Sequence, residues 1–150
     1  MDTEAGDAFV EAWVSALPAE AWAAPLEPLR TIKPVYALEL EWQNGGFHQY
    51  FNNPSGDDWP DALAALERIG ASRVKELFES ALAVFPDSAP STDHLTRAKQ
   101  LDDAGQDAID ILDRLDDQYT ALSKKFPVED SYAKMAEFLR QHGEGLTTRL

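Results

Sequence analysis

Apolar residues recur every three or four positions along much of this chain, and the longest such series lies between residues 98 and 122. Its members are Ala98, Leu101, Gly105, Ala108, Leu112, Leu115, Tyr119 and Leu122. A series of this kind that continues for more than three heptads is typical of one face of a helix packed against other helices. The sequence therefore predicts one long helix from about Thr92 to Ser123, with Ser91 or Thr92 as its N-cap.

Four shorter segments show the same helical spacing of apolar residues. They cover residues 7–17, 58–69, 74–85 and 129–141, and Pro18, Gly70 and Pro86 follow the first three. Pro and Gly at these places are typical of helix ends. We therefore predict an all-α fold with roughly six to eight helices, and a single compact domain spanning residues 1–150.

The segment from Ile32 to Asn53 has two interpretations. Leu38, Leu40 and Trp42 alternate with acidic residues ahead of Asn44-Gly45, which is typical of a strand that enters a hairpin. Alternatively, Pro34 lies in the first turn of a helix that ends at Gly45-Gly46. A lone hairpin is only marginally stable, and no third strand is predicted elsewhere. We therefore predict a helix.

Charge excludes several classes of partner. The chain has 13 Lys and Arg residues against 27 Asp and Glu, a net charge of −14, and it has no Cys. Such a protein repels nucleic-acid phosphates and anionic membrane surfaces, so neither is an expected direct partner. Disulfides and thiolate metal sites are excluded. The acidic N-terminus is unlike a signal peptide and no apolar run could span a bilayer, so we expect a cytoplasmic protein.

The acidic residues are concentrated in three segments, residues 1–29, 55–67 and 102–117. In the predicted long helix, six of the seven Asp residues fall on the face opposite the apolar series: Asp102, Asp103, Asp107, Asp110, Asp113 and Asp117. Seven acids over fifteen helical steps give one per roughly 3.7 Å of axis, close to the phosphate rise of about 3.4 Å along one DNA strand. Asp57, Asp58 and Asp61 form a second acidic cluster. Either set is a candidate partner-binding surface or a solvated face.

No motif for a nucleotide, a metal ion or a catalytic triad occurs in the sequence, so we expect no cofactor, no metal ion and no enzymatic activity. The one candidate polar pocket lies around a double-glycine turn and consists of Glu41, Asn44, His48, Gln49 and Tyr50. There Glu41 and His48 could act as an acid–base pair. The alternative is a packed corner, because Phe47, Tyr50 and Phe51 share one face of a short helix.

The run from Asn44 to Asn53, with Ser55-Gly56 after it, resembles the signature of a bacterial domain family that includes the DNA mimic protein DMP-nineteen. The segment from Ala65 to Ala71 and the helix that ends at Phe85-Pro86 carry the same resemblance. It covers about residues 34–132 and leaves residues 1–30 as an N-terminal helical extension. The resemblance implies an all-α fold, a homodimer, and an acidic surface that imitates DNA phosphates.

These observations favour an acidic, non-enzymatic protein that resembles a DNA mimic and occupies the basic surface of a DNA-binding protein, such as a transcription factor or a nucleoid protein. The resembling residues form the corner and not the acidic surface, so the resemblance assigns no role to an individual Asp. Two alternatives remain open at this point: an immunity-type inhibitor of a basic toxin or nuclease, and a small-ligand or enzymatic site around Glu41, Asn44, His48 and Gln49.

Overall fold

The computed structural model describes residues 3–23, 27–125 and 131–143, and within these ranges the chain is all-α, as predicted. It has no strand there, and its seven α-helices are joined by two short 3-10 helices. Their bounds are α1 (Thr3–Ser15), α2 (Ala19–Ala23), α3 (Leu29–Asn52), η1 (Pro54–Asp58), α4 (Trp59–Ile69), α5 (Ser72–Leu82), η2 (Pro86–Ser88), α6 (His94–Lys125) and α7 (Ser131–His142). Among the described residues, no helix is both long and apolar enough to cross a membrane.

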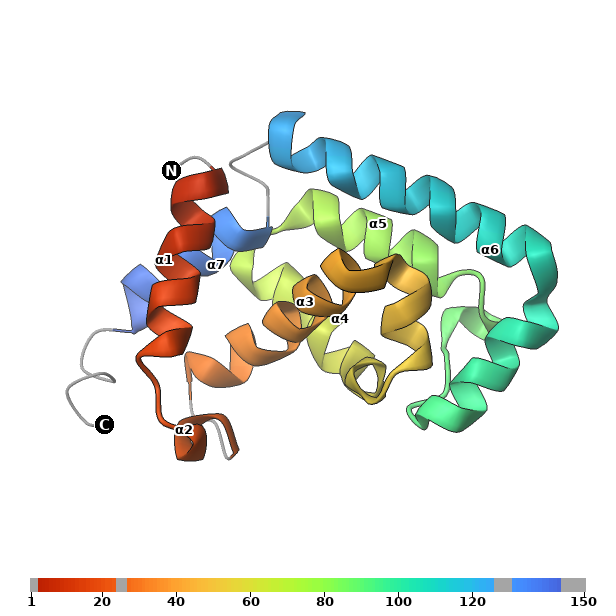
Figure 1. Cartoon of the computed structure of the whole chain (residues 1–150), viewed down its shortest axis with the longest axis horizontal. Coiled ribbons are helices and arrows are strands. Elements are labelled where there is room, and N and C mark those ends of the chain that lie inside the picture. The colour runs from red at the N-terminus through yellow and green to blue at the C-terminus, as the bar shows by residue number, and fades with distance from the viewer. Residues whose placement is uncertain (1–2, 24–26, 126–130, 144–150) are drawn as a thin grey trace.

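Helix α3 lies at the centre of the fold and packs against α6 and α4, and α5 packs against both of these helices. Helices α1 and α7 pair at the opposite end from the bend in α6 (Figure 1). In that pair the guanidinium carbon of Arg140 lies 4.5 Å from the centroid of the Phe9 ring. Because α6 contacts the rest of the fold along one side only, its other side forms an edge of the molecule.

The ambiguous segment is helical, which confirms the prediction for residues 32–53, but its details differ. Helix α3 begins at Leu29, so Pro34 lies in the second turn rather than the first. The helix breaks at Gly45 and Gly46, and Gly46 has a φ of +73° that L side chains rarely adopt. Beyond the break, Phe47 and Tyr50 are fully buried, so the short helix of the predicted corner is present.

The predicted continuous long helix is wrong at one position. Gly105 has φ +81° and ψ −172°, and it divides α6 into two helices that meet at an angle (Figure 1). Leu101 and Ala108, on either side, are buried, whereas Gly105 itself is exposed and does not belong to the packed face. The predicted N-cap is also wrong: the carboxylate of Asp93 accepts hydrogen bonds from the backbone N–H and the hydroxyl of Thr96, both at 2.9 Å.

An aromatic cluster joins α3 to α5. The ring of Phe78 lies 6.4 Å from the rings of both Phe47 and Phe51 and 5.8 Å from the ring of Tyr50, and Phe85 meets Phe51 at 4.8 Å. All five rings are buried. Pairs of aromatic rings at these separations stabilise a core beyond the area they bury. The broken α3 is therefore held in place by packing on the far side of its glycines.

We expect Gly105→Ala to destabilise the protein more than Gly70→Ala. Both glycines have a positive φ, and a Cβ added at either position would meet no atom within 4 Å, so only backbone strain differs. Gly70 is a left-handed helix C-cap, which other residues adopt at about 1 kcal/mol, whereas the region of Gly105 is essentially restricted to glycine at about 2–3 kcal/mol. Urea unfolding of both variants measures the difference. A loss of stability for Gly105→Ala no larger than that for Gly70→Ala would contradict the argument that the backbone at Gly105 is restricted to glycine.

Candidate functional site

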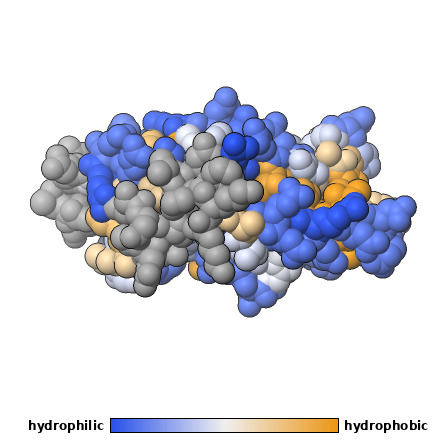
Figure 2. All heavy atoms as spheres, turned by 90° about the horizontal axis from the view of Figure 1, so that it is seen from above, coloured by the Kyte–Doolittle hydropathy of each residue, from blue (hydrophilic) through white to orange (hydrophobic). Residues whose placement is uncertain are grey.

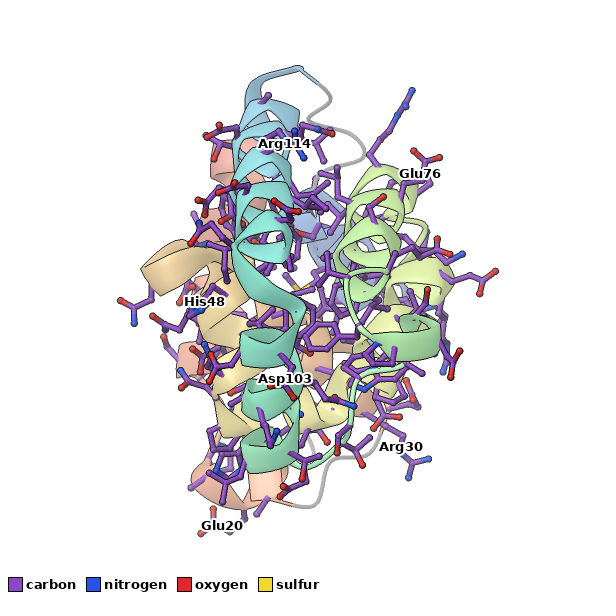
Figure 3. All side chains as sticks on the ribbon, turned by 90° about the vertical axis from the view of Figure 1, so that its right-hand side faces the viewer. Glu20, Arg30, His48, Glu76, Asp103 and Arg114 are labelled. Atoms are coloured by element: carbon purple, nitrogen blue, oxygen red, sulfur yellow. The ribbon has the colours of Figure 1, made fainter. Side chains whose placement is uncertain are left out.

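Six carboxylates lie on the outer side of α6, and we call this set the α6 acidic surface. It consists of Asp102, Asp103, Asp107, Asp110, Asp113 and Asp117, all of which are exposed. Asp103 and Arg114 mark its two parts in Figure 3, one on each side of the bend at Gly105. The bend means that Asp102 and Asp103 belong to a helix with a different direction from that of the other four.

Few of these carboxylates are neutralised within the described part of the chain. Asp103 forms an ion pair with Lys99 at 3.0 Å, and Asp110 accepts a hydrogen bond from the Gln106 amide at 3.0 Å. The other four accept no hydrogen bond and form no ion pair with a described residue, and neither does Arg114 in their midst. The carboxylates without a partner can therefore meet cations from outside. The face of the molecule seen in Figure 2 is mostly hydrophilic, and an apolar strip lies between hydrophilic residues on it.

The seventh acid of this segment, Asp116, points the other way. Its carboxylate accepts hydrogen bonds from the indole N–H of Trp42 at 2.9 Å and from the backbone N–H of Phe47 at 3.0 Å. Burial raises the pKa of Asp116, the nearby carboxylates of Asp113 and Asp117 raise it further, and the two hydrogen bonds oppose that rise. The indole of Trp42 also stacks on Tyr119 at 4.2 Å. Asp116 thus joins α6 to the break in α3.

The second acidic cluster is divided between two environments. Asp57 faces inward, where one carboxylate oxygen lies 2.9 Å from Nη1 of Arg97 and the other lies 4.0 Å from Nδ1 of His94. Asp58 and Asp61 are exposed and line a groove between α3 and α4. The structure therefore does not place the three acids on one surface.

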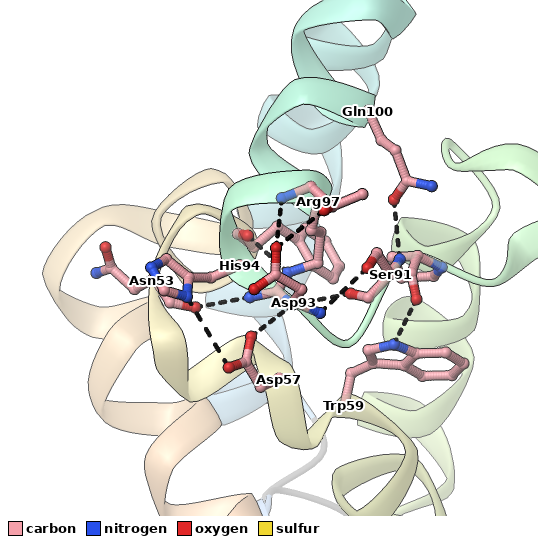
Figure 4. A network of polar contacts seen from close by, with 11 residues as sticks. Asn53, Asp57, Trp59, Ser91, Asp93, His94, Arg97 and Gln100 are labelled. Carbon is pink, nitrogen blue, oxygen red and sulfur yellow. Dashed lines mark hydrogen bonds and ion pairs between the residues drawn. The ribbon is translucent and has the colours of Figure 1, made fainter.

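The partner of Asp57 is a residue that the sequence analysis overlooked. Arg97 is completely buried, and Figure 4 shows it among Asn53, Asp57 and Ser91. Its Nε and Nη2 atoms donate to the carbonyls of Phe51 and Asn53, both at 2.7 Å, and Nη1 donates to the Ser91 carbonyl at 2.9 Å as well as to Asp57. A signal was present in the sequence, because Arg97 precedes the apolar Leu101 by four residues and so lies on the same helix face.

The candidate polar pocket does not assemble as one site in the structure. Glu41 accepts hydrogen bonds from the side chains of Gln49 at 2.7 Å, Asn53 at 2.9 Å and Ser55 at 3.1 Å. His48 is exposed and lies 3.0 Å from the Asn52 amide instead. Burial acts to raise the pKa of Glu41, but the three hydrogen bonds outweigh it and the pKa is lowered. An ionised carboxylate held this way ties α3 to η1.

The remaining two members of that set lie in different environments from each other. Asn44 is exposed. Tyr50 is fully buried, its hydroxyl has no hydrogen-bond partner among the described residues, and burial raises its pKa. A buried Glu39 accepts hydrogen bonds from Tyr119 and Ser131 in the interior. No cluster of His, Asp or Glu in the described ranges is arranged to hold a metal ion.

Comparison with known proteins gives one match. A family model described as DMP19-like protein matches residues 25–142, which run from just before α3 to the end of α7. The match leaves α1 and α2 outside and is wider at both ends than the region that carries the sequence resemblance. No curated protein and no solved structure matches the chain.

Replacing Arg97 with Met is expected to lower the free energy of unfolding by about 3–5 kcal/mol, because Asp57 and three backbone carbonyls, one of them in a fully buried hydrogen bond, lose their donor at once. The matched control is Arg30→Met, at an exposed residue whose guanidinium has no partner among the described residues; there we expect a change within about 0.5 kcal/mol. Chemical denaturation measures both. Similar losses for the two variants would contradict the structural role of Arg97.

Glu41→Gln is expected to make stability less dependent on pH in the acidic range. Since the folded-state pKa of Glu41 lies below the ordinary value of 4.5, ionised Glu41 stabilises the fold at higher pH, and this contribution is lost as the pH falls through the folded-state pKa. The difference in unfolding free energy between the native protein and the variant should be largest near neutrality and shrink in acid. A difference that stays constant over this range would refute it.

Proposed function

Because this chain belongs to the DMP19-like protein family, we propose that it is a non-enzymatic DNA mimic that occupies the basic DNA-binding surface of a transcription factor or a nucleoid protein. In this proposal the α6 acidic surface takes the place of DNA phosphates. In this proposal the protein acts in the cytoplasm, as expected from its sequence, and as a homodimer, as the family resemblance implies.

The observation that carries the proposal is the exposure of six like charges on the outer side of α6, two before the bend at Gly105 and four after it. Asp113 and Asp117 are four residues apart, and Asp107 and Asp110 three apart, on the part of α6 that follows Gly105, and each such pair costs a few tenths of a kcal/mol. One ion pair, between Lys99 and Asp103, is present to offset this repulsion. Lys and Arg side chains of a partner would relieve it, so the surface supports binding to a basic protein.

The spacing of the charges supports the proposal less directly than the sequence suggested. From Asp107 to Asp117, ten helical steps cover about 15 Å and carry four exposed carboxylates, one per roughly 5 Å between neighbours. That density is lower than the phosphate density of one DNA strand, about one per 3.4 Å. Asp116 is turned inward and Gly105 bends the helix, which accounts for the difference. The proposal therefore depends on sign and exposure, and not on a matching repeat.

The mechanism that follows is electrostatic competition. Carboxylates on an edge of the molecule attract a cationic DNA-binding surface over a Debye length, and the bound protein then excludes DNA from that surface. The net charge of −14 adds to the attraction at long range. Both effects decrease as salt is added.

To test the proposal, the triple variant Asp107→Asn, Asp110→Asn, Asp113→Asn is compared with the triple variant Glu67→Gln, Glu76→Gln, Glu79→Gln. Both sets are exposed and remove the same number of charges, but the second set lies on α4 and α5. Each protein is added to complexes of labelled DNA with purified DNA-binding proteins of the same organism, and fluorescence anisotropy reports displacement of the DNA.

We expect the native protein to displace DNA from at least one partner, the Asp triple variant to do so about tenfold less well, and the Glu triple variant to differ by no more than about twofold. Equal weakening by both variants would show that bulk charge rather than the α6 acidic surface is responsible. Absence of displacement across the panel would overturn the proposal. Inhibition of a nuclease without competition against DNA would favour the immunity-type alternative.

A further inference from the structure

A groove of about 560 Å³ lies between the first half of α3 and α4 and reaches η1 at one end. This volume is in the range of sites that bind small molecules or a few peptide residues. Small side chains line its middle, because Pro34 and Ala37 on α3 face Ala64 and Ala65 on α4. None of its lining residues belongs to α6, so the groove is separate from the α6 acidic surface.

One end of the groove is basic in an otherwise acidic protein. Arg30, Lys33 and Arg68 line it, together with the single carboxylate of Glu27. Arg68 pairs with Glu27 at 3.2 Å, and Lys33 donates to the Trp22 carbonyl at 2.7 Å. The guanidinium of Arg30 has no partner among the described residues, and its side chain projects away from the fold (Figure 3). This end can therefore receive a carboxylate from outside.

The other end of the groove is acidic. Asp58 and Asp61 line it on the α4 side and are both exposed. Neither carboxylate accepts a hydrogen bond or forms an ion pair with a described residue. A ligand that brings a positive charge here and a negative charge to Arg30 would neutralise both ends at once.

The distance between the two ends follows from helix geometry. Asp61 at the acidic end and Arg68 at the basic end are seven residues apart on α4, so they are separated by about 10.5 Å along the helix axis. An extended peptide advances about 3.3–3.6 Å per residue, so three residues cover this length. A short extended peptide therefore fits the charge separation.

We propose that this groove binds an extended peptide segment in which a Lys or Arg lies three residues away from an Asp or Glu. The cation of the ligand contacts Asp58 and Asp61, and its carboxylate contacts the guanidinium of Arg30 in the paired geometry that Arg favours. The two intervening side chains lie over Ala37 and Ala64. This binding requires no part of the α6 acidic surface.

The test uses the full-length protein and two peptides of the same composition, acetyl-Lys-Ala-Ala-Glu-amide and acetyl-Ala-Lys-Glu-Ala-amide. In the second peptide the charges are adjacent and cannot reach both ends of the groove. Calorimetric titration at low salt is expected to give a dissociation constant about three- to tenfold lower for the first peptide, because two exposed ion pairs form instead of one. Backbone amide NMR signals of Ala37 and Ala64 should shift with the first peptide.

Variants of exposed residues assign the binding to the groove. Arg30→Gln and Asp61→Asn are each expected to weaken binding of the first peptide about two- to fivefold. Their matched controls are Arg73→Gln on α5 and Asp110→Asn on the α6 acidic surface, neither of which lines the groove, and both should leave binding unchanged. Circular dichroism confirms that each variant is folded.

Three outcomes would overturn the proposal. They are equal affinity for the two peptides, no binding of either at millimolar concentration, and self-association that Arg30→Gln abolishes, which would show that a second copy of the chain fills the groove. The proposed DNA mimicry is tested separately, since Asp110→Asn affects only the α6 acidic surface. A protein that displaces DNA and ignores the peptides would keep the first function and lose this one.

Discussion

The buried guanidinium of Arg97 is the interaction on which the arrangement of the chain depends. Burying an unpaired guanidinium costs several kcal/mol, so its position is set by the groups that compensate it: Asp57 and three backbone carbonyls. Two of these carbonyls, of Phe51 and Asn53, lie at the C-terminal end of α3, where helices leave carbonyls unpaired and carry partial negative charge. The side chain of Arg97 thus pairs carbonyls at the end of α3, contacts η1 through Asp57, and contacts the loop before α6 through the Ser91 carbonyl.

Asp116 makes a second connection between the same two helices, and together the two connections determine which acids face outward. The break at Gly46 leaves the Phe47 N–H without a helical partner, and Asp116 accepts its hydrogen bond. A side chain at Gly46 would clash, since its Cβ would lie 2.4 Å from an oxygen of Asp116. With Arg97 and Asp116 pointing inward from opposite sides of Gly105, rotation of either half of α6 is prevented. The exposure of Asp107 and Asp113 is therefore a consequence of polar contacts in the interior.

How far the sequence predicted this arrangement depends on the kind of information each feature needs. Spacing of apolar residues and the lack of a third strand were sufficient to predict that α3 is helical and that Phe47 and Tyr50 are buried beyond its break. The bend at Gly105 was missed because a glycine at a seam position also fits close helix packing, and spacing carries no information on φ.

The roles of Asp57 and Asp116 were missed because their partners are distant in sequence: 40 residues separate Asp57 from Arg97, and 69 separate Phe47 from Asp116. In the groove, the placement of Arg30 and Asp61 at opposite ends likewise depends on how α3 meets α4.

Salt acts in opposite directions on the stability and on the proposed binding of such a protein. Screening weakens the repulsion among the carboxylates of the α6 acidic surface and of the whole chain, so added salt stabilises the folded state. The same screening weakens attraction to a basic partner. An acidic surface that only maintains solubility in salt would show the first effect alone, whereas a surface that replaces DNA shows both. The mixed-charge groove contains three cations, Arg30, Lys33 and Arg68, and three carboxylates, Glu27, Asp58 and Asp61, so its charges balance. Added salt therefore weakens binding of its ligand without a large change in the stability of the fold. The two surfaces of this protein are therefore physically distinguishable even though a single net charge of −14 describes them together.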